Sequence, residues 1–373
     1  MAGPGRRYLG IVLAVAGIAV LVGVGLLGSR ASGSSDIPVG QTTDPGVKST
    51  PTIVRIPLGG EAYDLAVSSD GNHLWAAILR KNEPDELIAI DPASRTTTAR
   101  ALPDSDYGGF VSRVVVAEDG SVWVSQPYRL VRFDPVTGTS FLIEFDLDAD
   151  GAVTDALDPA NPLPGTWVSA IATRGPWIAV ARNNVALLTV LDMKLVELDP
   201  IPVPSPYAGS QDLAWASDRL LWAISGPTYD RSVALIDTTG RITEELAGGG
   251  TRLEQARDGV LALGLSNGAA QLSTAAPAWL GTTSGASDES RIAALGTVVA
   301  IYDAVANTIT KFDGDIPVGI LQLEEATIEL RPPNGGEPRA SRIRPRINDL
   351  GVDRDGNVWY LDGNAHEAVL VVW

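Results

Sequence analysis

One short phrase occurs twice, far apart in the chain, and constrains the fold more than any other feature of the sequence. The phrase reads "VVVAEDGSVWVSQ" at residues 114–126 and "LGVDRDGNVWYLDG" at residues 350–363. Each copy joins an apolar run to a second run with a tryptophan through an Asp-Gly turn. Because Gly and Asp tolerate positive φ, this turn is typical of tight β-hairpins. The sequence therefore predicts the same hairpin at two distant places.

Weaker copies of the phrase fill the interval. The repeats align on Trp75, Trp123, Trp177, Trp222, Leu261, Val299 and Trp359. The anchors are about 47 residues apart on average, and each repeat has room for about four short strands, which is typical of a β-propeller. We expect an all-β fold with a single propeller of seven blades. Six or eight blades remain alternatives because the repeats at 251–281 and 290–324 are degenerate.

The ring is expected to close with a strand from each end of the chain. The last repeat contains only three strand-like runs, whereas "TIVRIPL" at residues 52–58 belongs to no repeat of its own. An unpaired strand edge exposes backbone donors and acceptors. We therefore predict that residues 52–58 supply the fourth strand of the last blade.

The repeat phrases "VAEDGSVWVSQ" and "VDRDGNVWYLDG" resemble those of streptogramin-lyase-like and NHL-type propellers. The similarity spans most of residues 52–373 as a pattern of strands and turns, and it implies the fold. It also implies that any activity of the lyase kind would be metal-assisted acid/base chemistry, with histidine at the channel mouth. His366 is the one histidine expected on that side, and no residues match the activity motif. His73 falls in an Asp-Gly turn on the opposite face.

The N-terminal segment predicts a membrane anchor. Residues 9–27 contain no charged side chain, and a helix of this length nearly spans a hydrocarbon core of about 30 Å. We expect a transmembrane helix or uncleaved signal anchor at residues 9–28, with residues 1–8 in the cytoplasm because Arg6 and Arg7 precede it. A cleaved signal peptide is the alternative, and it would make the protein secreted. Residues 29–51 are rich in Gly, Ser, Thr and Pro and predict a flexible tether to the propeller at residues 52–373.

Composition narrows the classes of function. The net charge of −17 argues against a nucleic-acid partner, because phosphates would be repelled over most of the surface. The absence of cysteine excludes disulfides, thiolate metal sites and a cysteine nucleophile. Two histidines leave little scope for histidine-based catalysis.

An arginine-rich segment is the first candidate site. Two long connections between repeats, residues 144–166 and 324–346, are expected on the same face of the propeller. The second concentrates five arginines, namely Arg331, Arg339, Arg342, Arg344 and Arg346. The planar guanidinium fork matches carboxylates and phosphates, so these arginines and His366 predict a binding surface for an acidic protein or an anionic cell-envelope ligand. The alternative is that the arginines pair with the protein's own acids, including the 146–158 loop.

The other long connection predicts a calcium site. Alternating carboxylates followed by glycine place several oxygens around one hard cation, and the candidate ligands are Asp146, Asp148, Asp150 and Asp155. The pattern then departs from an EF-hand, because Leu157 stands where that loop has a bidentate Glu. A solvated acidic loop is the alternative, and no other cofactor is expected.

These observations favour a bacterial, single-pass membrane protein with an extracytoplasmic propeller that acts as a binding scaffold or sensor. The alternative function is an enzyme on the same fold, a lyase or a hydrolase of envelope glycans. It predicts a metal or paired carboxylates at the channel mouth. A structural partner in a membrane assembly is a third class, and it predicts an exposed apolar patch on a blade edge.

Overall fold

The computed structural model describes most of the chain from residue 50 onward. The described ranges are 50–80, 84–103, 113–126, 129–144, 168–182, 187–192, 199–203, 210–225, 232–246, 252–256, 259–265, 268–272, 278–282, 289–314, 316–330 and 339–373. Lys48–Trp373 is one compact unit. The described residues contain no helix with the length and apolar character needed to cross a bilayer. The anchor predicted at 9–28 lies outside these ranges.

The described strands form seven four-stranded antiparallel sheets and one two-stranded hairpin. The first three sheets contain β2 (Glu61–Val67), β3 (Leu74–Leu79), β4 (Glu86–Asp91) and β5 (Thr96–Ala101); β6 (Arg113–Val116), β7 (Val122–Gln126), β8 (Arg129–Asp134) and β9 (Thr139–Glu144); and β10 (Val168–Arg174), β11 (Trp177–Arg182), β12 (Leu187–Asp192) and β13 (Ile201–Pro202). The next three contain β14 (Asp212–Ser217), β15 (Leu220–Ser225), β16 (Ser232–Asp237) and β17 (Ile242–Leu246); β18 (Arg252–Ala256), β19 (Gly259–Leu265), β20 (Gly268–Leu272) and β21 (Ala278–Thr282); and β22 (Arg291–Leu295), β23 (Val298–Asp303), β24 (Thr308–Asp313) and β25 (Ile316–Gln322).

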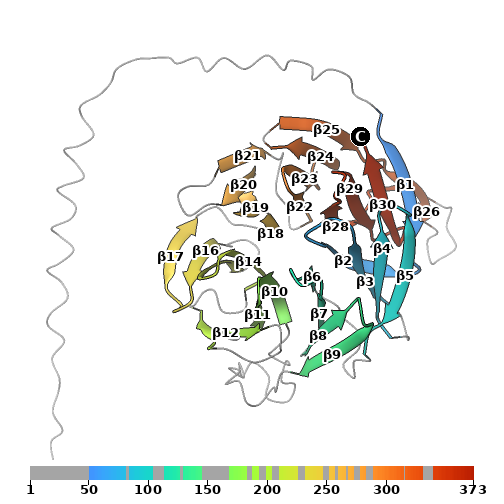
Figure 1. Ribbon diagram of the computed structural model, residues 1–373. Coiled ribbons are helices and arrows are strands. Elements are labelled where there is room, and N and C mark those ends of the chain that lie inside the picture. Colours follow the sequence, from blue (N-terminus) through green and yellow to red (C-terminus); the bar gives the residue numbers. More distant parts are fainter. Residues whose placement is uncertain are drawn as a thin grey trace, which may run out of the picture. The chain divides into compact units, whose positions relative to one another are not determined.

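The last sheet contains β28 (Ile347–Val352), β29 (Val358–Asp362), β30 (Glu367–Val372) and β1 (Thr52–Pro57). The sheets stand side by side around a common centre, and the first strand of each repeat lies innermost (Figure 1). The predicted all-β propeller is therefore confirmed.

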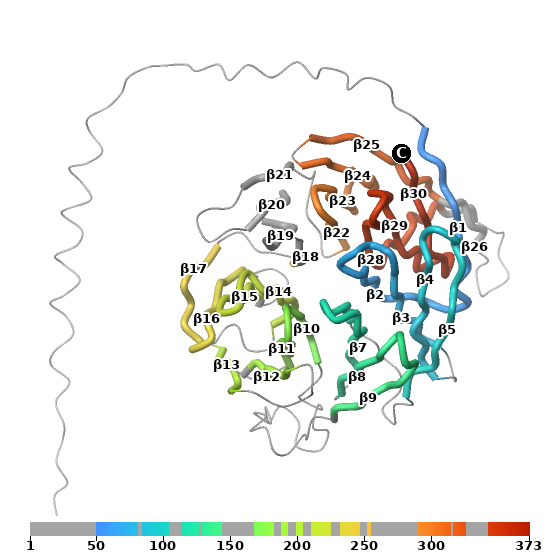
Figure 2. The backbone as a smooth tube through the Cα atoms, viewed as in Figure 1, coloured from blue at the N-terminus to red at the C-terminus, as the bar shows by residue number. Residues whose placement is uncertain are grey.

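The ring closes as the sequence predicted. β1 pairs antiparallel with β30 in a continuous register from Thr52 opposite Val372 to Pro57 opposite Glu367. The tube in Figure 2 shows the start and the end of the described chain lying side by side at this seam. The strand from the N-terminal side thus covers the edge of β30 that the last repeat would otherwise leave open.

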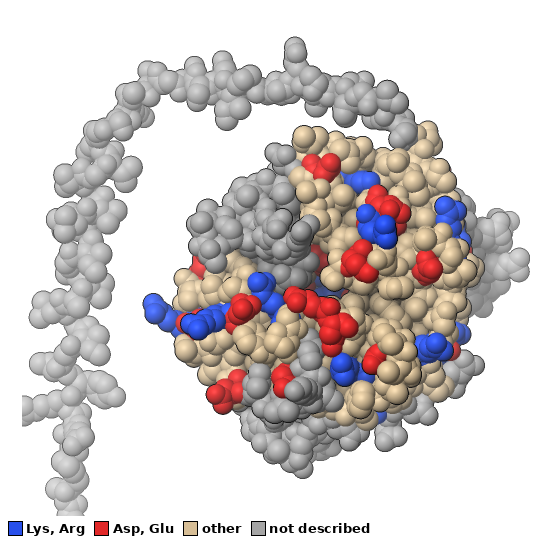
Figure 3. Space-filling view, in the orientation of Figure 1, with Lys and Arg blue, Asp and Glu red and all other residues tan. Residues whose placement is uncertain are grey.

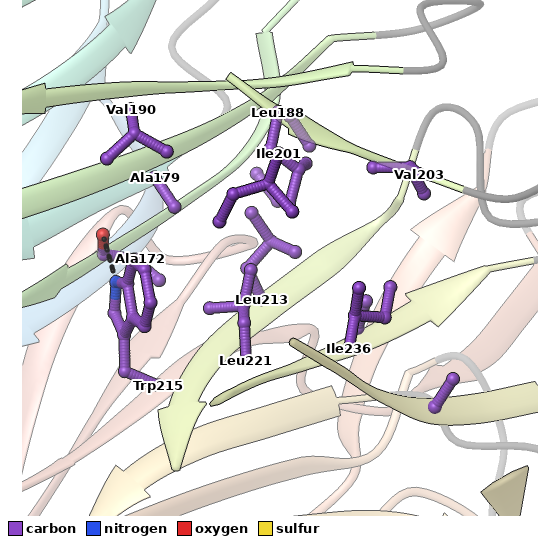
Figure 4. Close-up of a cluster of buried hydrophobic side chains, with 14 residues drawn as sticks. Ala172, Ala179, Leu188, Val190, Ile201, Val203, Leu213, Trp215, Leu221 and Ile236 are labelled. Atoms are coloured by element: carbon purple, nitrogen blue, oxygen red, sulfur yellow. Dashed lines mark hydrogen bonds between the residues drawn. The ribbon is translucent and has the colours of Figure 1, made fainter. Parts of the chain in front are cut away.

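The core consists of apolar side chains packed between neighbouring sheets. Figure 4 shows one such cluster, in which Leu213 and Trp215 of β14 meet Ala172 and Leu188 of the preceding sheet. The indole Nε1 of Trp215 donates a hydrogen bond to the carbonyl of Ala172 at 3.2 Å. Inner strands are apolar on both faces because each face packs against a different neighbouring sheet.

The repeated phrase builds a turn that also supplies a partner for its tryptophan. Gly120 and Gly356 adopt φ of 82° and 74°, the left-handed conformation that glycine favours. Trp123 and Trp359 are fully buried. Their indole Nε1 atoms donate to Ser121 Oγ and Asp353 Oδ2, both at 2.9 Å. The phrase therefore fixes the hairpin and satisfies the buried indole together.

The alignment at Trp177 is wrong. Trp123 lies opposite Val115, whereas Trp177 is the first residue of β11 and lies opposite Arg174. A two-residue turn joins β10 to β11, which is shorter than the Asp-Gly turn of the repeat phrase. The shorter turn places Trp177 at the strand end, where it packs against Trp215 with ring centroids 6.2 Å apart.

The arginine-rich connection is not simply a loop. Within residues 324–346, β26 (Ala326–Leu330) pairs with β27 (Arg339–Ile343) as an added hairpin. Arg339 lies opposite Leu330 and Arg342 lies opposite Thr327. Alternating apolar and polar residues in "ATIEL" and "RASRI" are compatible with paired strands, so the local pattern overrides the loop expected from composition.

Candidate functional site

Charged residues occupy the matching position of six inner strands, directly before the apolar run. They are Asp64, Arg113, Asp212, Arg252, Arg291 and Asp349, and we call them the charge ring. β10 has Ser169 near the same level, and its Oγ donates to the carbonyl of Ser210 at 2.7 Å. In Figure 1 the inner strands surround the centre of the ring, so the charge ring lies around that centre, toward the end at which these strands begin.

Three of the four ion pairs of the charge ring join sheets that are not neighbours. Arg113 lies 3.3 Å from Asp64 and 2.6 Å from Asp212, and Asp212 belongs to a sheet two places along the ring. Arg252 lies 3.0 Å from Asp64 and 3.2 Å from Asp349. These side chains are nearly buried, with exposed fractions from 4% for Asp64 to 18% for Arg252. The guanidinium groups therefore cross the channel and tie opposite sides of the ring together.

The aspartates of the charge ring also bind the backbone of the next sheet. The amides of Leu65, Val114 and Leu253 donate to the carboxylates of Asp349, Asp64 and Asp212 at 2.8, 2.6 and 2.9 Å, respectively. In each case the amide belongs to the inner strand of the following sheet. A carboxylate that accepts both a backbone N–H and a guanidinium has its lone pairs well satisfied.

Burial and neighbouring charges shift the pKa values of these groups in different directions. Burial alone would raise the pKa of Asp64, but Arg113 and Arg252 hold that pKa below its usual value. Burial raises the pKa of Asp349 to about 6, against the opposing effect of Arg252. Burial alone would lower the pKa of Arg252, but Asp349 and Asp64 hold it above its usual range, so this guanidinium stays charged.

Glu254 adds a carboxyl group next to the charge ring. It lies two residues after Arg252 on the same face of β18 and is partly buried. Burial, and then the charge of Asp349, raise the pKa of Glu254 to about 8. At neutral pH this side chain is therefore mainly a neutral carboxylic acid.

Arg291 belongs to the charge ring and also lines a pocket. Its Nε donates to the carbonyl of Asn348 at 2.6 Å and its Nη1 donates to the carbonyl of Ser290 at 2.9 Å. Burial, and then the positive charge of Arg252, lower the pKa of Arg291 to about 10. The pocket has a volume of about 180 Å³ and is lined by Glu289, Arg291, Tyr302, Pro345, Arg346, Ile347 and Asn348.

Three arginines of the predicted binding surface have described side chains, all three are exposed, and Arg346 also lines this pocket. Arg342 is exposed. Arg344 is 54% exposed and lies 3.2 Å from Glu325, while Arg346 is 60% exposed and lies 2.8 Å from Glu61. We call these three residues the arginine rim. For Arg344 and Arg346 the alternative of pairing with the protein's own acids holds, through Glu325 and Glu61.

Of the remaining predicted binding residues, only His366 has a described side chain. Arg331 lies outside the described residues, as does the side chain of Arg339. His366 is exposed at the turn between β29 and β30, with φ of 57°, and its carbonyl accepts a hydrogen bond from Leu58 N at 3.0 Å. This hydrogen bond joins the end of β1 to the turn before β30, at the seam of the ring.

The predicted calcium ligands Asp146, Asp148, Asp150 and Asp155 lie outside the described residues, so the calcium site stays a prediction. Elsewhere, within the ranges that the structure describes, no three His, Asp or Glu side chains are grouped to hold a metal. Figure 3 shows acidic side chains near the middle of the ring on one face of the molecule.

An apolar strip lies on the outer strand β25. Ile316, Val318 and Ile320 alternate along this strand and are 62%, 51% and 60% exposed. Alternate residues of a strand share one face, so the three side chains form one surface feature. An exposed strip on a blade edge is the feature that the structural-partner class predicts.

The charge ring is the feature that sequence reasoning missed. Its signal was present in the repeats, since "DLAVS", "SRVVVAE", "QDLAWAS", "SRIAAL" and "NDLGVD" each carry a charged residue immediately before the apolar run. In ring order, the charge at this position is negative in some repeats and positive in others, which predicts ion pairs across the channel.

Comparison with known proteins places the chain by its fold. No protein-family model matches the sequence. No curated protein is significantly similar to it in sequence. Solved structures match closely in shape. A streptogramin B lyase aligns with a TM-score of 0.61 and 15% identity, over 86% of this chain and 97% of the lyase.

Two further structures extend the comparison. The virginiamycin B lyase of Staphylococcus aureus aligns with a TM-score of 0.57 and 14% identity, over 87% of this chain and 99% of that one. The β-propeller domain of Cps50 (Swd1) from Myceliophteria thermophila aligns with a TM-score of 0.56 and 12% identity, over 85% and 98% of the two chains. At these identities the likeness establishes the fold and leaves the activity open. The resemblance to streptogramin-lyase-like propellers is thus confirmed at the level of the fold.

Proposed function

We propose that the protein is a binding scaffold or sensor: a seven-bladed propeller held outside the cytoplasm by the segment at residues 9–28. Its partner is an acidic protein surface or an anionic cell-envelope ligand, which docks on the arginine rim. The exposure of three arginines within five residues of sequence, one of which lines a pocket, carries this proposal.

The charge ring makes ligand binding inside the channel end unfavourable and so favours binding at the arginine rim. Arg113 and Arg252 span the channel end and are held by carboxylates from several sheets. A ligand that entered the channel there would have to separate buried ion pairs, and leaving a buried charge without its partner costs several kcal/mol. The rim is accessible without that cost.

The ion pairs of the rim do not prevent docking. The pairs of Arg344 with Glu325 and of Arg346 with Glu61 are at the surface. Exposed pairs contribute about 0–1 kcal/mol, so an incoming carboxylate or phosphate can replace either acid with little loss. A partner with several anionic groups would engage the three guanidinium groups together.

Co-purification from native membranes tests this proposal. Full-length protein is compared with the triple variant Arg342→Ala, Arg344→Ala, Arg346→Ala. A matched control changes Arg219, Arg241 and Arg354 to alanine, three exposed arginines in turns at the opposite end of the strands. We expect a stoichiometric partner with the native protein and the control, and its loss from the rim variant. Equal recovery with all three proteins would contradict the proposal.

A second candidate function is an enzyme on the same fold, a lyase or glycan-active hydrolase. The raised pKa values of Glu254 and Asp349 favour it, because perturbed carboxyl groups near one another are typical of acid/base catalysis. The variant Glu254→Gln discriminates between the two functions. An enzyme of this kind would lose turnover of envelope glycans with Glu254→Gln and keep it in the rim variant. A binding module would keep its partner with Glu254→Gln and lose it in the rim variant.

A further inference from the structure

The pocket beside the arginine rim has a defined size and a mixed lining. It lies between the inner strand β22 and the segment that leads into β28, and its volume is about 180 Å³. A water molecule occupies about 30 Å³ of liquid, so the pocket holds the volume of about six waters. A ligand of roughly six to nine non-hydrogen atoms fits this space.

Positive charge dominates one part of the lining. Arg291 and Arg346 both line the pocket, and Arg291 is fixed in place by its hydrogen bonds to the carbonyls of Asn348 and Ser290. Burial is the main cause of the lowered pKa of Arg291, and the charge of Arg252 adds to it. A carboxylate placed against Arg291 and Arg346 would be attracted by both guanidinium groups.

Polar groups of the opposite character complete the lining. Glu289 supplies a carboxylate, and the phenol of Tyr302 can donate or accept a hydrogen bond. Burial, and then the charge of Glu289, raise the pKa of Tyr302, so this phenol remains protonated and available as a donor at neutral pH. The lining thus offers sites for one anionic and one cationic group within a small volume.

We propose that this pocket binds a small α-amino acid, with the ligand carboxylate at Arg291 and Arg346 and the ligand ammonium group at Glu289. The inference rests on the proposed function, since it names a ligand class for the same rim. It goes further by separating a small-molecule site from the surface where the larger partner docks. Ligand occupancy at Arg346 would then alter the rim that the partner contacts.

Calorimetric titration of the full-length protein in detergent tests the pocket. The probes are alanine, serine and aspartate, with propionate, which lacks the ammonium group, and alanine amide, which lacks the carboxylate. We expect saturable binding of at least one amino acid, and at least tenfold weaker binding of both truncated probes. Failure of all three amino acids to bind at millimolar concentration would overturn the proposal, and so would equal affinity for propionate and alanine.

Two variants place the binding in the pocket. Arg346→Gln and Tyr302→Phe are each expected to weaken amino-acid binding at least fivefold. Arg344→Gln is the matched control, because Arg344 is equally exposed on the rim but does not line the pocket. Unchanged affinity in both pocket variants, with thermal unfolding showing that they are folded, would overturn the proposal.

The two proposals fail separately. Amino-acid binding that depends on Arg346, together with a partner that is insensitive to the rim alanines, would support the pocket and contradict the docking surface. Loss of the partner from the rim variant without any amino-acid binding would contradict the pocket alone.

Discussion

The same chemical contact, arginine with carboxylate, occurs in two regions that differ in environment. In the charge ring, Arg113 and Asp212 are 12% and 6% exposed. In the arginine rim, Arg346 and Glu61 are 60% and 26% exposed. A buried pair is costly to break, because its remaining partner keeps an unsatisfied charge, whereas an exposed pair exchanges with water and salt. The charge ring therefore holds the fold, and the rim is free to bind.

The largest expected effect comes from removing the guanidinium that contacts two aspartates. Arg252→Ala leaves Asp64 and Asp349 without this partner, and removing one member of a buried ion pair costs about 3–5 kcal/mol. Urea unfolding followed by tryptophan fluorescence measures the change. Arg344→Ala serves as the control for loss of an arginine. A loss of unfolding free energy for Arg252→Ala no larger than that of the control would contradict the claim that the charge ring stabilises the fold more than the rim does.

The second effect is a gain in stability from Glu254→Gln that depends on pH. The folded pKa of Glu254, about 8, lies above its ordinary value, so the native protein loses stability as pH rises from about 4.5 through 8. Glutamine removes this loss. Because the side chain is partly exposed, the expected gain is roughly 2 kcal/mol at pH 9, less than the full pKa shift implies, and it falls toward zero by pH 4.

Thermal or urea unfolding of both proteins from pH 4 to pH 9 checks this pH dependence. Glu325→Gln is the matched control, because Glu325 makes an exposed pair with Arg344. A difference between native protein and Glu254→Gln that grows as pH falls would have the wrong sign and would contradict the burial of this carboxyl.

A third, smaller effect is expected at the rim. Arg344→Ala and Arg346→Ala should each lower stability by about 0–1 kcal/mol, because each removes only an exposed ion pair. The same urea titration measures this change alongside partner recovery. A loss above about 2 kcal/mol for either variant would show that the rim is structural and would weaken its assignment to binding.

The smallest effect is a difference in response to salt. At 1 M ionic strength the screening length falls to about 3 Å, so exposed pairs are screened and buried pairs much less so. Raising the salt concentration should release the docked partner and leave the cost of Arg252→Ala nearly unchanged. Release of the partner together with a large fall in that cost would show that both regions are open to solvent.

Much of the fold was predictable from the sequence because propeller repeats are local. Three local patterns predicted the sheets and the seam between β1 and β30. They are the Asp-Gly turn of "EDGSVW", the apolar inner runs and the unassigned strand at 52–58. The alignment failed at Trp177, where a shorter turn moved the tryptophan to a strand end. The hairpin at 326–343 was missed because charged residues and prolines obscured two short strands.

The site was less predictable because it depends on contacts between distant repeats. Clustered arginines were visible at 339–346, but the pairing of Arg346 with Glu61 follows only from the way the ring closes, and that of Arg344 with Glu325 from the hairpin of β26 and β27. The charge ring was visible as a repeated position, yet the pairing of Arg113 with Asp212 needs the geometry of the channel. Calcium binding by the 146–155 loop stays a prediction.

Site-specific photo-cross-linking in native membranes is the most direct test of the central claim, that the arginine rim is the docking surface. A photoreactive residue replaces Arg342 in one protein and Arg354, which is 62% exposed at the opposite end of the strands, in another. The account predicts a single strong adduct from position 342 and none from position 354. Adducts from position 354 alone would place the partner on the other face and contradict the account.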